Sequence, residues 1–372
     1  MIRDAQQHNE NATPKDFEID VLMEALPHYF DGDGNFKLEK FQNMLQEEQV
    51  ELSRESYELN FLGKSYARLL ASLETETVIV PNEEHNADER NADSENIYIT
   101  GDNLDALKHL AKSYRGKVKC IYIDPPYNTG SDDFAYNDTF NFTPDDLVDQ
   151  IGITEEEAER ILDLQGKASH SAWLTFMLPR LVIAKTLLTP DGAIFASIDA
   201  NEQANLRLLM DEVFGEDNLI GQVSVPKGTT TGQDAGDMGS SIDYMLCYSR
   251  DKREFVLSGL PLDEEDQARF NRSDSHGRYS MLQFRKTGNN DRREDRPNLY
   301  FGLTAPDGTE VFPIGPSGYE SRWRGDRELF DSWAEKDMIV WEQKEEGWKP
   351  YVKYYLEGRT KSVSNLWEGF EW

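Results

Sequence analysis

At 372 residues the chain can bury one large core or two modest ones, and two domains are expected for this length. Hydrophobic residues make up 38%, and no apolar run approaches the roughly 18 residues that a membrane-spanning helix needs. The start of the chain is too polar for a signal peptide, and the chain has only two cysteines. The composition predicts a cytoplasmic protein with no membrane contact, no disulfide and no metal site.

The overall charge is strongly acidic, but one stretch is basic. The 39 Lys and Arg residues against 70 Asp and Glu residues give a net charge of −31, which opposes contact with phosphates and fits a solubility surface or a salt-adapted host. Between residues 269 and 296 the sign inverts. The basic side chains of this stretch are Arg269, Arg272, Arg278, Arg285, Lys286, Arg292, Arg293 and Arg296. A local basic surface is therefore predicted.

Residues 1–95 are predicted to form helices followed by a linker, because residues 82–96 are rich in Asn, Asp and Glu. A literal Phe-x-Gly-x-Gly match runs from Phe30 to Gly34. It follows a helical pattern and contains two aspartates, so we expect a turn between helices rather than a glycine nest. The spacing also imitates a calcium loop, but Phe36 and Gln42 stand where Gly and Glu are required.

Strands and helices alternate through the next region, which is typical of an α/β domain. The predicted strands are residues 96–99, 118–123, 193–198, 219–225 and 242–248, and the predicted helices are residues 103–113, 154–164, 173–188 and one that ends at Gly215. The strand at 118–123 shows little alternation, which predicts burial on both faces in a parallel sheet. Cys120 and Cys247 are expected to be buried in such strands. The Gly- and Thr-rich stretch 227–241 is predicted to be a mobile loop.

The segment Asp124-Pro125-Pro126-Tyr127 directly follows an apolar strand, where open α/β sheets bind ligands. The exocyclic amine of a nucleic-acid base is a poor nucleophile, and two aimed acceptors would localise its lone pair. The carboxylate of Asp124 can accept one N–H, and the carbonyl of Pro125, directed by two prolines, can accept the other. Tyr127 offers a stacking face for a flipped base. The alternative is an ordinary Asp-Pro turn.

Several short segments along the chain carry a resemblance to a known family. They are Gly63-Lys64-Ser65-Tyr66-Ala67, Gly101-Asp102-Asn103-Leu104, the run from Ile121 to Gly130, His170-Ser171-Ala172-Trp173-Leu174, Ser197-Ile198-Asp199, Asn201-Glu202 and the run from Met210 to Phe214. On these segments the chain resembles the modification (Mod) subunit of type III restriction-modification systems, which belongs to the β-class amino methyltransferases.

The resemblance implies an activity and partners. It implies a site-specific DNA methyltransferase that transfers a methyl group from S-adenosylmethionine to adenine N6 in double-stranded DNA. It also implies a homodimer that serves a restriction (Res) helicase-nuclease subunit. Asp102 and Asn103 are implied to contact the donor, and the alternative for both is a helix cap. Asp199 either lines the same pocket or caps the helix before Glu202.

The resemblance also implies a domain order. The implied fold is a Rossmann-like methyltransferase sheet, incomplete here, with an N-terminal helical region (1–95), a catalytic region (96–250) and a C-terminal β-rich target-recognition domain (251–372). In the family a Phe-x-Gly-x-Gly donor loop follows the recognition domain, and we find no convincing copy of it in this sequence. We therefore expect the front portion of a longer protein, and the sequence leaves open whether these residues are active by themselves.

The recognition region contains many Trp and Tyr residues, most of which are expected to be core. Its basic residues are better candidates for DNA contact, because Arg pairs well with phosphates and guanine edges. Arg285, Lys286, Arg292 and Arg293 are the candidates, and surface charge without a role is the alternative for each. By resemblance, Asp at position 124 favours adenine, and the length of the region favours duplex DNA. The alternatives are a cytosine-N4 or RNA methyltransferase and an inactive DNA-recognition remnant that lacks the donor site.

Overall fold

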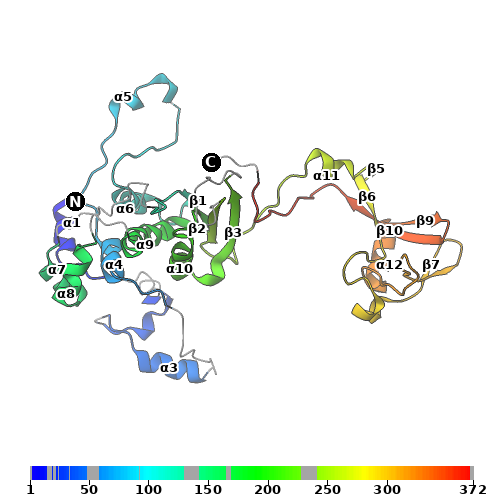
Figure 1. Cartoon of the computed structure of the whole chain (residues 1–372), viewed down its shortest axis with the longest axis horizontal. Helices are drawn as coiled ribbons and strands as arrows, with labels where there is room; N and C mark the ends of the chain where they lie inside the picture. The colour runs from blue at the N-terminus through cyan, green and yellow to red at the C-terminus, as the bar shows by residue number, and fades with distance from the viewer. Residues whose placement is uncertain are drawn as a thin grey trace, which may run out of the picture. The chain divides into compact units, whose positions relative to one another are not determined.

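The computed structural model divides into two compact units, residues 1–256 with 364–372 (unit 1) and residues 257–363 (unit 2), and each is described by itself (Figure 1). The structure describes residues 2–14, 19, 22–23, 25–32, 34–47, 58–91, 93–129, 142–164, 169–227 and 241–368. Most of the predicted mobile loop at 227–241 lies outside the described residues. Among the described residues, no helix combines the length and apolar character that crossing a bilayer requires.

Unit 1 contains a four-stranded mixed sheet with the order β1-β2-β4-β3. Its strands are β1 Val118–Ile123, β2 Leu188–Ile198, β3 Leu219–Pro226 and β4 Ile242–Ser249. β1 runs parallel to β2, whereas β4 runs antiparallel to β2 and β3. The predicted α/β class is confirmed, and the strand at 118–123 pairs in parallel as predicted, but the rest of the sheet is antiparallel because β4 runs opposite to both β2 and β3.

Unit 1 also contains helices. They are α1 Ile2–Asn9, α3 Leu38–Glu47, α4 Lys64–Ser72, α5 Glu83–Asn86, α6 Asn103–Tyr114, α7 Pro144–Ile151, α8 Glu155–Leu162, α9 His170–Leu187 and α10 Gln203–Phe214, with short 3₁₀ turns η1 Pro27–Tyr29, η2 Glu89–Asn91 and η3 Glu216–Asn218. α9 and α10 supply most of the main core together with β2 and β4 (Figure 1). α9 is apolar on nearly all sides and tolerates Pro179 in its interior. The burial of its apolar side chains stabilises α9 more than the intrinsic helix propensity of its residues does.

Local sequence signals predicted several of these elements well. β1 has the predicted bounds, and α10 ends at Gly215. Thr154 and Glu157 form the predicted capping box at the start of α8. The Phe30–Gly34 match is the expected turn, since the Asp31 carboxylate accepts a hydrogen bond from the Asn35 amide at 2.8 Å and Phe30 pairs with Phe36.

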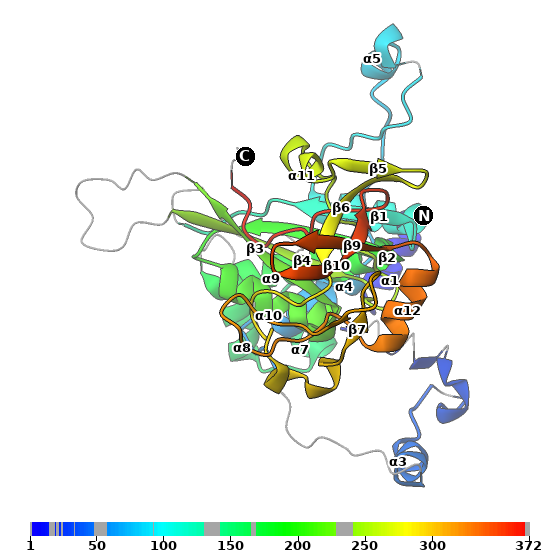
Figure 2. The same ribbon diagram turned by 90° about the vertical axis from the view of Figure 1, so that its right-hand side faces the viewer.

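Burial was predicted less well. The expected strand at residues 96–99 is wrong, because these residues have no strand partner and Tyr98 is 87% exposed. This segment and α5 lie away from the sheet in both views (Figures 1 and 2). Cys120 is exposed rather than buried, since β1 pairs only with β2 in the described part of the chain. Cys247 is buried as expected, and burial raises the pKa of its thiol to about 12.

A second core joins α4 to α6, α7, α8 and α9 through Tyr66, Leu69 and their neighbours. Gly63 caps the start of α4 in the left-handed region, with φ of 95°. A Cβ atom at this position would lie 2.4 Å from Oγ1 of Thr175 on α9. Glycine therefore allows both the backbone turn and the close approach of α4 to α9.

Unit 2 is a smaller β-rich unit. Its elements are α11 Glu264–Ala268, β5 Arg272–Asp274, β6 Gly277–Gln283, η4 Arg293–Asp295, η5 Pro297–Leu299, β7 Leu303–Thr304, β8 Glu310–Val311, α12 Arg327–Glu335, β9 Ile339–Lys344 and β10 Gly347–Tyr355. The main sheet has the order β5-β6-β10-β9. Trp323 stacks on Phe284 in its core, so aromatic anchors serve packing here, as expected from the sequence.

We predict that Gly63→Ala lowers the free energy of unfolding by about 2 to 5 kcal/mol, because it adds a steric clash to left-handed strain. Gly152→Ala is the matched control: Gly152 also has a positive φ, of 75°, but nothing lies within 4 Å of the added methyl group. The control is expected to cost only about 1 to 2 kcal/mol. Urea unfolding measures the free energy of unfolding of both variants. Equal losses would show that the close approach of α4 to Thr175 does not add to the cost of Gly63→Ala.

Candidate active site

The segment Asp124–Asn128 leaves the carboxyl end of β1 beside the neighbouring end of β2. Because β1 and β2 are parallel, with Ile123 opposite Ala196, the residues that follow both strands meet at one edge of the sheet. Ser197 of β2 donates a hydrogen bond from Oγ to Oδ1 of Asp124 at 2.7 Å. Asp124 is nevertheless exposed. This arrangement orients a carboxylate that remains accessible to a ligand.

The backbone of the same segment is held from α9. Nε1 of Trp173 donates a hydrogen bond to the Pro126 carbonyl at 2.6 Å, and Trp173 is itself fully buried. Among the described residues, none donates to the Pro125 carbonyl, and Pro125 itself is buried. Tyr127 packs partly against the main core. Burial, together with the charge of Asp124, raises the pKa of the Tyr127 hydroxyl, so this group stays protonated at neutral pH.

Two residues after β2 hold the end of the segment. Asn128 has a positive φ of 56°, which is costly for a residue other than glycine. Nδ2 of Asn201 donates to the Tyr127 carbonyl at 3.1 Å and to the Asn128 carbonyl at 2.5 Å. The Asn128 side chain in turn donates to Glu202 at 2.6 Å. These contacts compensate for the strained conformation.

Glu202 is a fully buried carboxylate with three donors. Besides Asn128, it accepts hydrogen bonds from Nδ1 of His170 and Nδ2 of Asn205, each at 2.7 Å. A buried carboxylate is stable only when such partners satisfy its oxygens. Glu202 therefore links the segment 124–128 to the starts of α9 and α10.

The sequence did not reveal the supporting roles of Trp173, Ser197, Asn201 and Glu202. All four belong to segments that carried the family resemblance, and that clustering was the available signal. Asp199 accepts a hydrogen bond from the Asn201 amide at 2.8 Å, which is a turn contact. It does not cap α10, whose N-cap is Glu202, so the cap that was one of its two alternatives is wrong.

Asp102 caps α6. Its Oδ1 atom accepts hydrogen bonds from the amides of Leu104 and Asp105 at 2.9 and 3.1 Å. Oδ1 of Asn103 accepts from Nε of the buried Arg180 at 2.5 Å. The cap was the alternative to a donor contact for Asp102, but its side chain is still 52% exposed, so capping does not prevent ligand contact.

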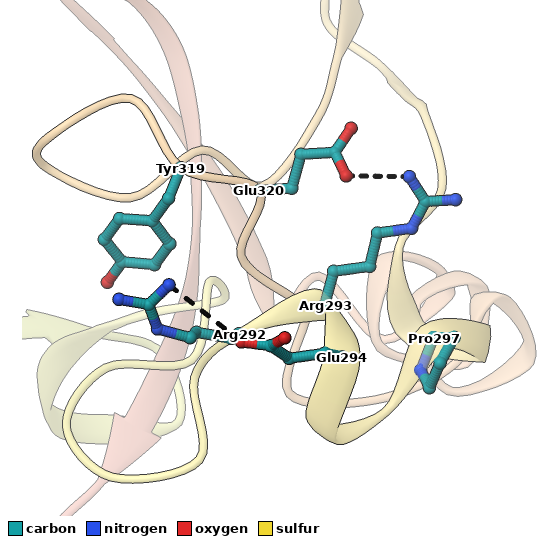
Figure 3. A pocket seen from close by; sticks show the side chains of 6 residues that line it. All are labelled: Arg292, Arg293, Glu294, Pro297, Tyr319 and Glu320. Carbon is teal, nitrogen blue, oxygen red and sulfur yellow. Dashed lines mark hydrogen bonds and ion pairs between the residues drawn. The ribbon is translucent and has the colours of Figure 1, made fainter.

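The four candidate DNA contacts differ in accessibility. Arg285 is nine-tenths buried and donates to Ser321 and Asp291, so the structure gives it an internal role and counts against phosphate contact. Lys286 is half-buried. Arg292 lies over the Tyr319 ring, and Arg293 pairs with Glu320 at 2.8 Å. Arg292 and Arg293 line an open pocket of about 470 Å³ with Glu294, Pro297, Tyr319 and Glu320 (Figure 3).

Comparison with known proteins shows the family to which this chain belongs. Residues 118–300 match a family described as DNA methylase. The type II methyltransferase M.KpnI of Klebsiella pneumoniae is 31% identical over 329 residues, which cover 82% of this chain and 70% of M.KpnI. The chain belongs to the DNA methylase family. Within this family its relatives include Mod subunits of type III restriction-modification enzymes.

Two Mod subunits illustrate the relationship. The EcoPI Mod subunit of Escherichia phage P1 is 36% identical over 96% of this chain and 59% of its own length. The EcoP15I Mod subunit of Escherichia coli is 46% identical over 67% of this chain and 38% of its own length. This DNA methylase chain thus spans less than two thirds of the length of each of these Mod subunits. A solved structure titled PvuII DNA methyltransferase (cytosine-N4-specific) is similar at 14% identity with a TM-score of 0.26, over 42% of this chain and 48% of that one, which is too low to support an argument.

We predict that Glu202→Gln in this DNA methylase lowers the free energy of unfolding by about 1 to 3 kcal/mol, because an amide group replaces one acceptor and faces other donors. Adding Asn205→Asp supplies an acceptor for that amide and should restore part of the loss. Glu216→Gln, at an exposed position, is the control and should change stability by less than about 0.5 kcal/mol. Chemical unfolding measures all three, and no loss in Glu202→Gln would contradict the role of this carboxylate.

Proposed function

We propose that the protein containing this chain is a site-specific DNA methyltransferase that uses S-adenosylmethionine to methylate adenine N6 in double-stranded DNA, within a restriction-modification system. The observation that supports this most is the geometry of residues 124–128: an accessible carboxylate oriented by Ser197 and a Pro125 carbonyl without a donor among the described residues, in a segment held from α9 and β2. The exocyclic amine of a base becomes nucleophilic when two correctly oriented hydrogen-bond acceptors localise its lone pair on the nitrogen atom.

The proposed mechanism assigns one task to each residue. Asp124 accepts one N–H of the flipped adenine, and the Pro125 carbonyl accepts the other, which localises the lone pair on N6. Tyr127 stacks on the base, and its protonated hydroxyl adds no charge beside Asp124. The donor, when bound, supplies an electrophilic methyl group. As the new N–C bond forms, the methyl–sulfur bond of the donor would break and leave a neutral thioether, while the amine gives up a proton that Asp124 is placed to accept.

The donor fits the described residues only in part. Asp102 and Asn103, at the start of α6, are the residues we propose for the donor's adenine end. No glycine nest that could approach its methionine end occurs among the described residues, since Phe30–Gly34 is a turn closed by Asp31 and Asn35. This shortfall favours the second candidate function, a DNA-recognition chain that is inactive by itself.

The proposed partners follow the names of the relatives, which are Mod subunits of restriction-modification enzymes. We propose a homodimer that associates with a Res subunit. In this assignment unit 1 includes the helical region and the catalytic region, and unit 2 serves target recognition. Arg292 and Arg293, on the open pocket of unit 2, are proposed DNA contacts (Figure 3).

We predict that Asp124→Ala abolishes methylation, by about a thousandfold or more, while DNA affinity stays within a few fold, because this carboxylate acts on the amine rather than on the DNA backbone. Asp199→Ala is the matched control: Asp199 follows β2 at the same sheet edge and is bonded only to its own turn in the hydrogen bonds seen. Single-turnover methylation and DNA binding are measured together. Activity within about tenfold of wild type would remove Asp124 from the catalytic role.

We predict that Tyr127→Ala lowers the methylation rate more than Tyr127→Phe does, because stacking on a flipped base needs the ring and not the hydroxyl. The expected difference is about fivefold to 150-fold, since base–aromatic stacking contributes about 1 to 3 kcal/mol. Thermal unfolding checks that both variants keep the packing of Tyr127 against the main core. Equal loss of rate in both would point instead to the hydroxyl and its contacts with Asp124 and Ser197.

A further inference from the structure

Unit 2 gathers basic side chains from two segments that are far apart in the sequence. Arg285 pairs with Trp323 as antiparallel backbone neighbours. The Lys286 amide donates to the Arg322 carbonyl at 2.9 Å, and the Arg324 amide donates to the Phe284 carbonyl at 2.9 Å. This pairing brings together a cluster that we call the cationic cluster, which consists of Arg285, Lys286, Arg322 and Arg324.

The cationic cluster has little neutralising charge. Nε of Arg322 donates to the Asn290 carbonyl at 2.6 Å, Nε of Arg324 donates to the Gln283 carbonyl at 2.7 Å, and Nζ of Lys286 donates to the Thr287 carbonyl at 3.1 Å. The carboxylate of Asp291 pairs with Arg285 at 3.4 Å. Within residues 257–363, all of which the structure describes, Lys286, Arg322 and Arg324 form no ion pair.

Other basic side chains of unit 2, unlike those of the cationic cluster, form ion pairs with carboxylates. Arg272 pairs with Glu342 at 2.8 Å, and Lys353 pairs with Asp274 and Asp337 at 2.9 and 2.8 Å. Carboxylates are abundant in a chain of net charge −31, so unpaired arginines are unexpected in it. The pKa of Arg324 is lowered by its burial and by the like charges of Arg285 and Arg322. An anion bound at this position would relieve that repulsion.

The chemistry of the cationic cluster favours phosphate. Guanidinium groups match phosphate oxygens with two parallel N–H donors, and Lys adds a point charge. The adjacent turn, residues 287–290, is Thr-Gly-Asn-Asn, and a methyl group added at Gly288 would meet nothing within 4 Å. The space beside Gly288, near Lys286 in the sequence, is therefore open.

We propose that Lys286, Arg322 and Arg324 bind a backbone phosphate of double-stranded DNA. This inference rests on the proposed function, because it takes DNA as the substrate. It adds Arg322 and Arg324 to the DNA contacts, and it ranks this cluster above Arg293, whose guanidinium must first leave Glu320 (Figure 3). A phosphate contact of this kind orients the duplex and carries no sequence information.

The test measures duplex affinity against salt concentration for the protein and for Arg322→Gln and Arg324→Gln. Each variant is expected to bind roughly threefold to tenfold more weakly at physiological salt, and the slope of log affinity against log salt should fall by about one. Arg322→Lys keeps the charge and should keep most of the slope. Arg272→Gln, which removes a paired arginine of the same unit, is the control and should bind like wild type.

Further readouts separate the possible failures. Thermal unfolding within about 2 °C of wild type shows that a variant is folded. Wild-type affinity and slope in folded Arg322→Gln and Arg324→Gln would overturn the phosphate site while leaving the proposed function intact. DNA binding with the expected loss in the variants, but without methylation by the wild-type protein, would overturn the proposed function alone. No DNA binding by the wild-type protein would overturn both.

Discussion

The buried carboxylate of Glu202 is the interaction on which the candidate active site depends. Three donors from three segments converge on it, namely Asn128, His170 and Asn205. Burying a carboxylate is unfavourable unless its oxygens are satisfied, so each donor stabilises the placement of the other two. The strained backbone of Asn128 is affordable because this network and Asn201 hold it. The conformation of the segment 124–128 therefore depends on the surrounding fold and not on its two prolines alone.

The mixed sheet explains why these groups meet. Parallel pairing of β1 and β2 brings the residues after both strands to one edge, where Ser197 reaches Asp124. α9 begins at the same edge, and its Trp173 reaches the Pro126 carbonyl. Antiparallel β4 then covers the other side of β2. The arrangement fixes the backbone of the segment while leaving the Asp124 carboxylate accessible, which a catalyst acting on an external base requires.

The sequence predicted elements whose signals are local. Thr154 and Glu157 predicted the start of α8, and Gly215 predicted the end of α10. The apolar run that begins at Val118 predicted the strand β1. The sequence failed where the outcome depends on distant neighbours. Cys120 is exposed because, among the described residues, β1 pairs with β2 on one side only. Residues 96–99 have no partner strand in the described part of the chain.

In the candidate site, too, the features set by local sequence could be predicted and those that depend on distant residues could not. Asp124 to Tyr127 could be identified from their chemistry and their position after a strand. The roles of Glu202 and Trp173 could not, because they arise only when segments more than 40 residues apart come together. The sequence did not identify Arg322 and Arg324 as candidate DNA contacts, for the same reason. They lie outside the basic stretch 269–296 in the sequence, and only backbone pairing with residues 284–286 places them beside that stretch.

The position of β1 at the end of the sheet has a consequence for handling this chain. In the described residues β1 hydrogen-bonds to β2 alone, and Tyr122 is 51% exposed beside the exposed Cys120. A sheet edge with apolar side chains is a template for another strand, from the same molecule or from a neighbour. Any strand that adds there lies next to Asp124. Self-association at high concentration and access to the Asp124 carboxylate are thereby linked, and a thiol-specific label on Cys120 would report whether this edge is covered.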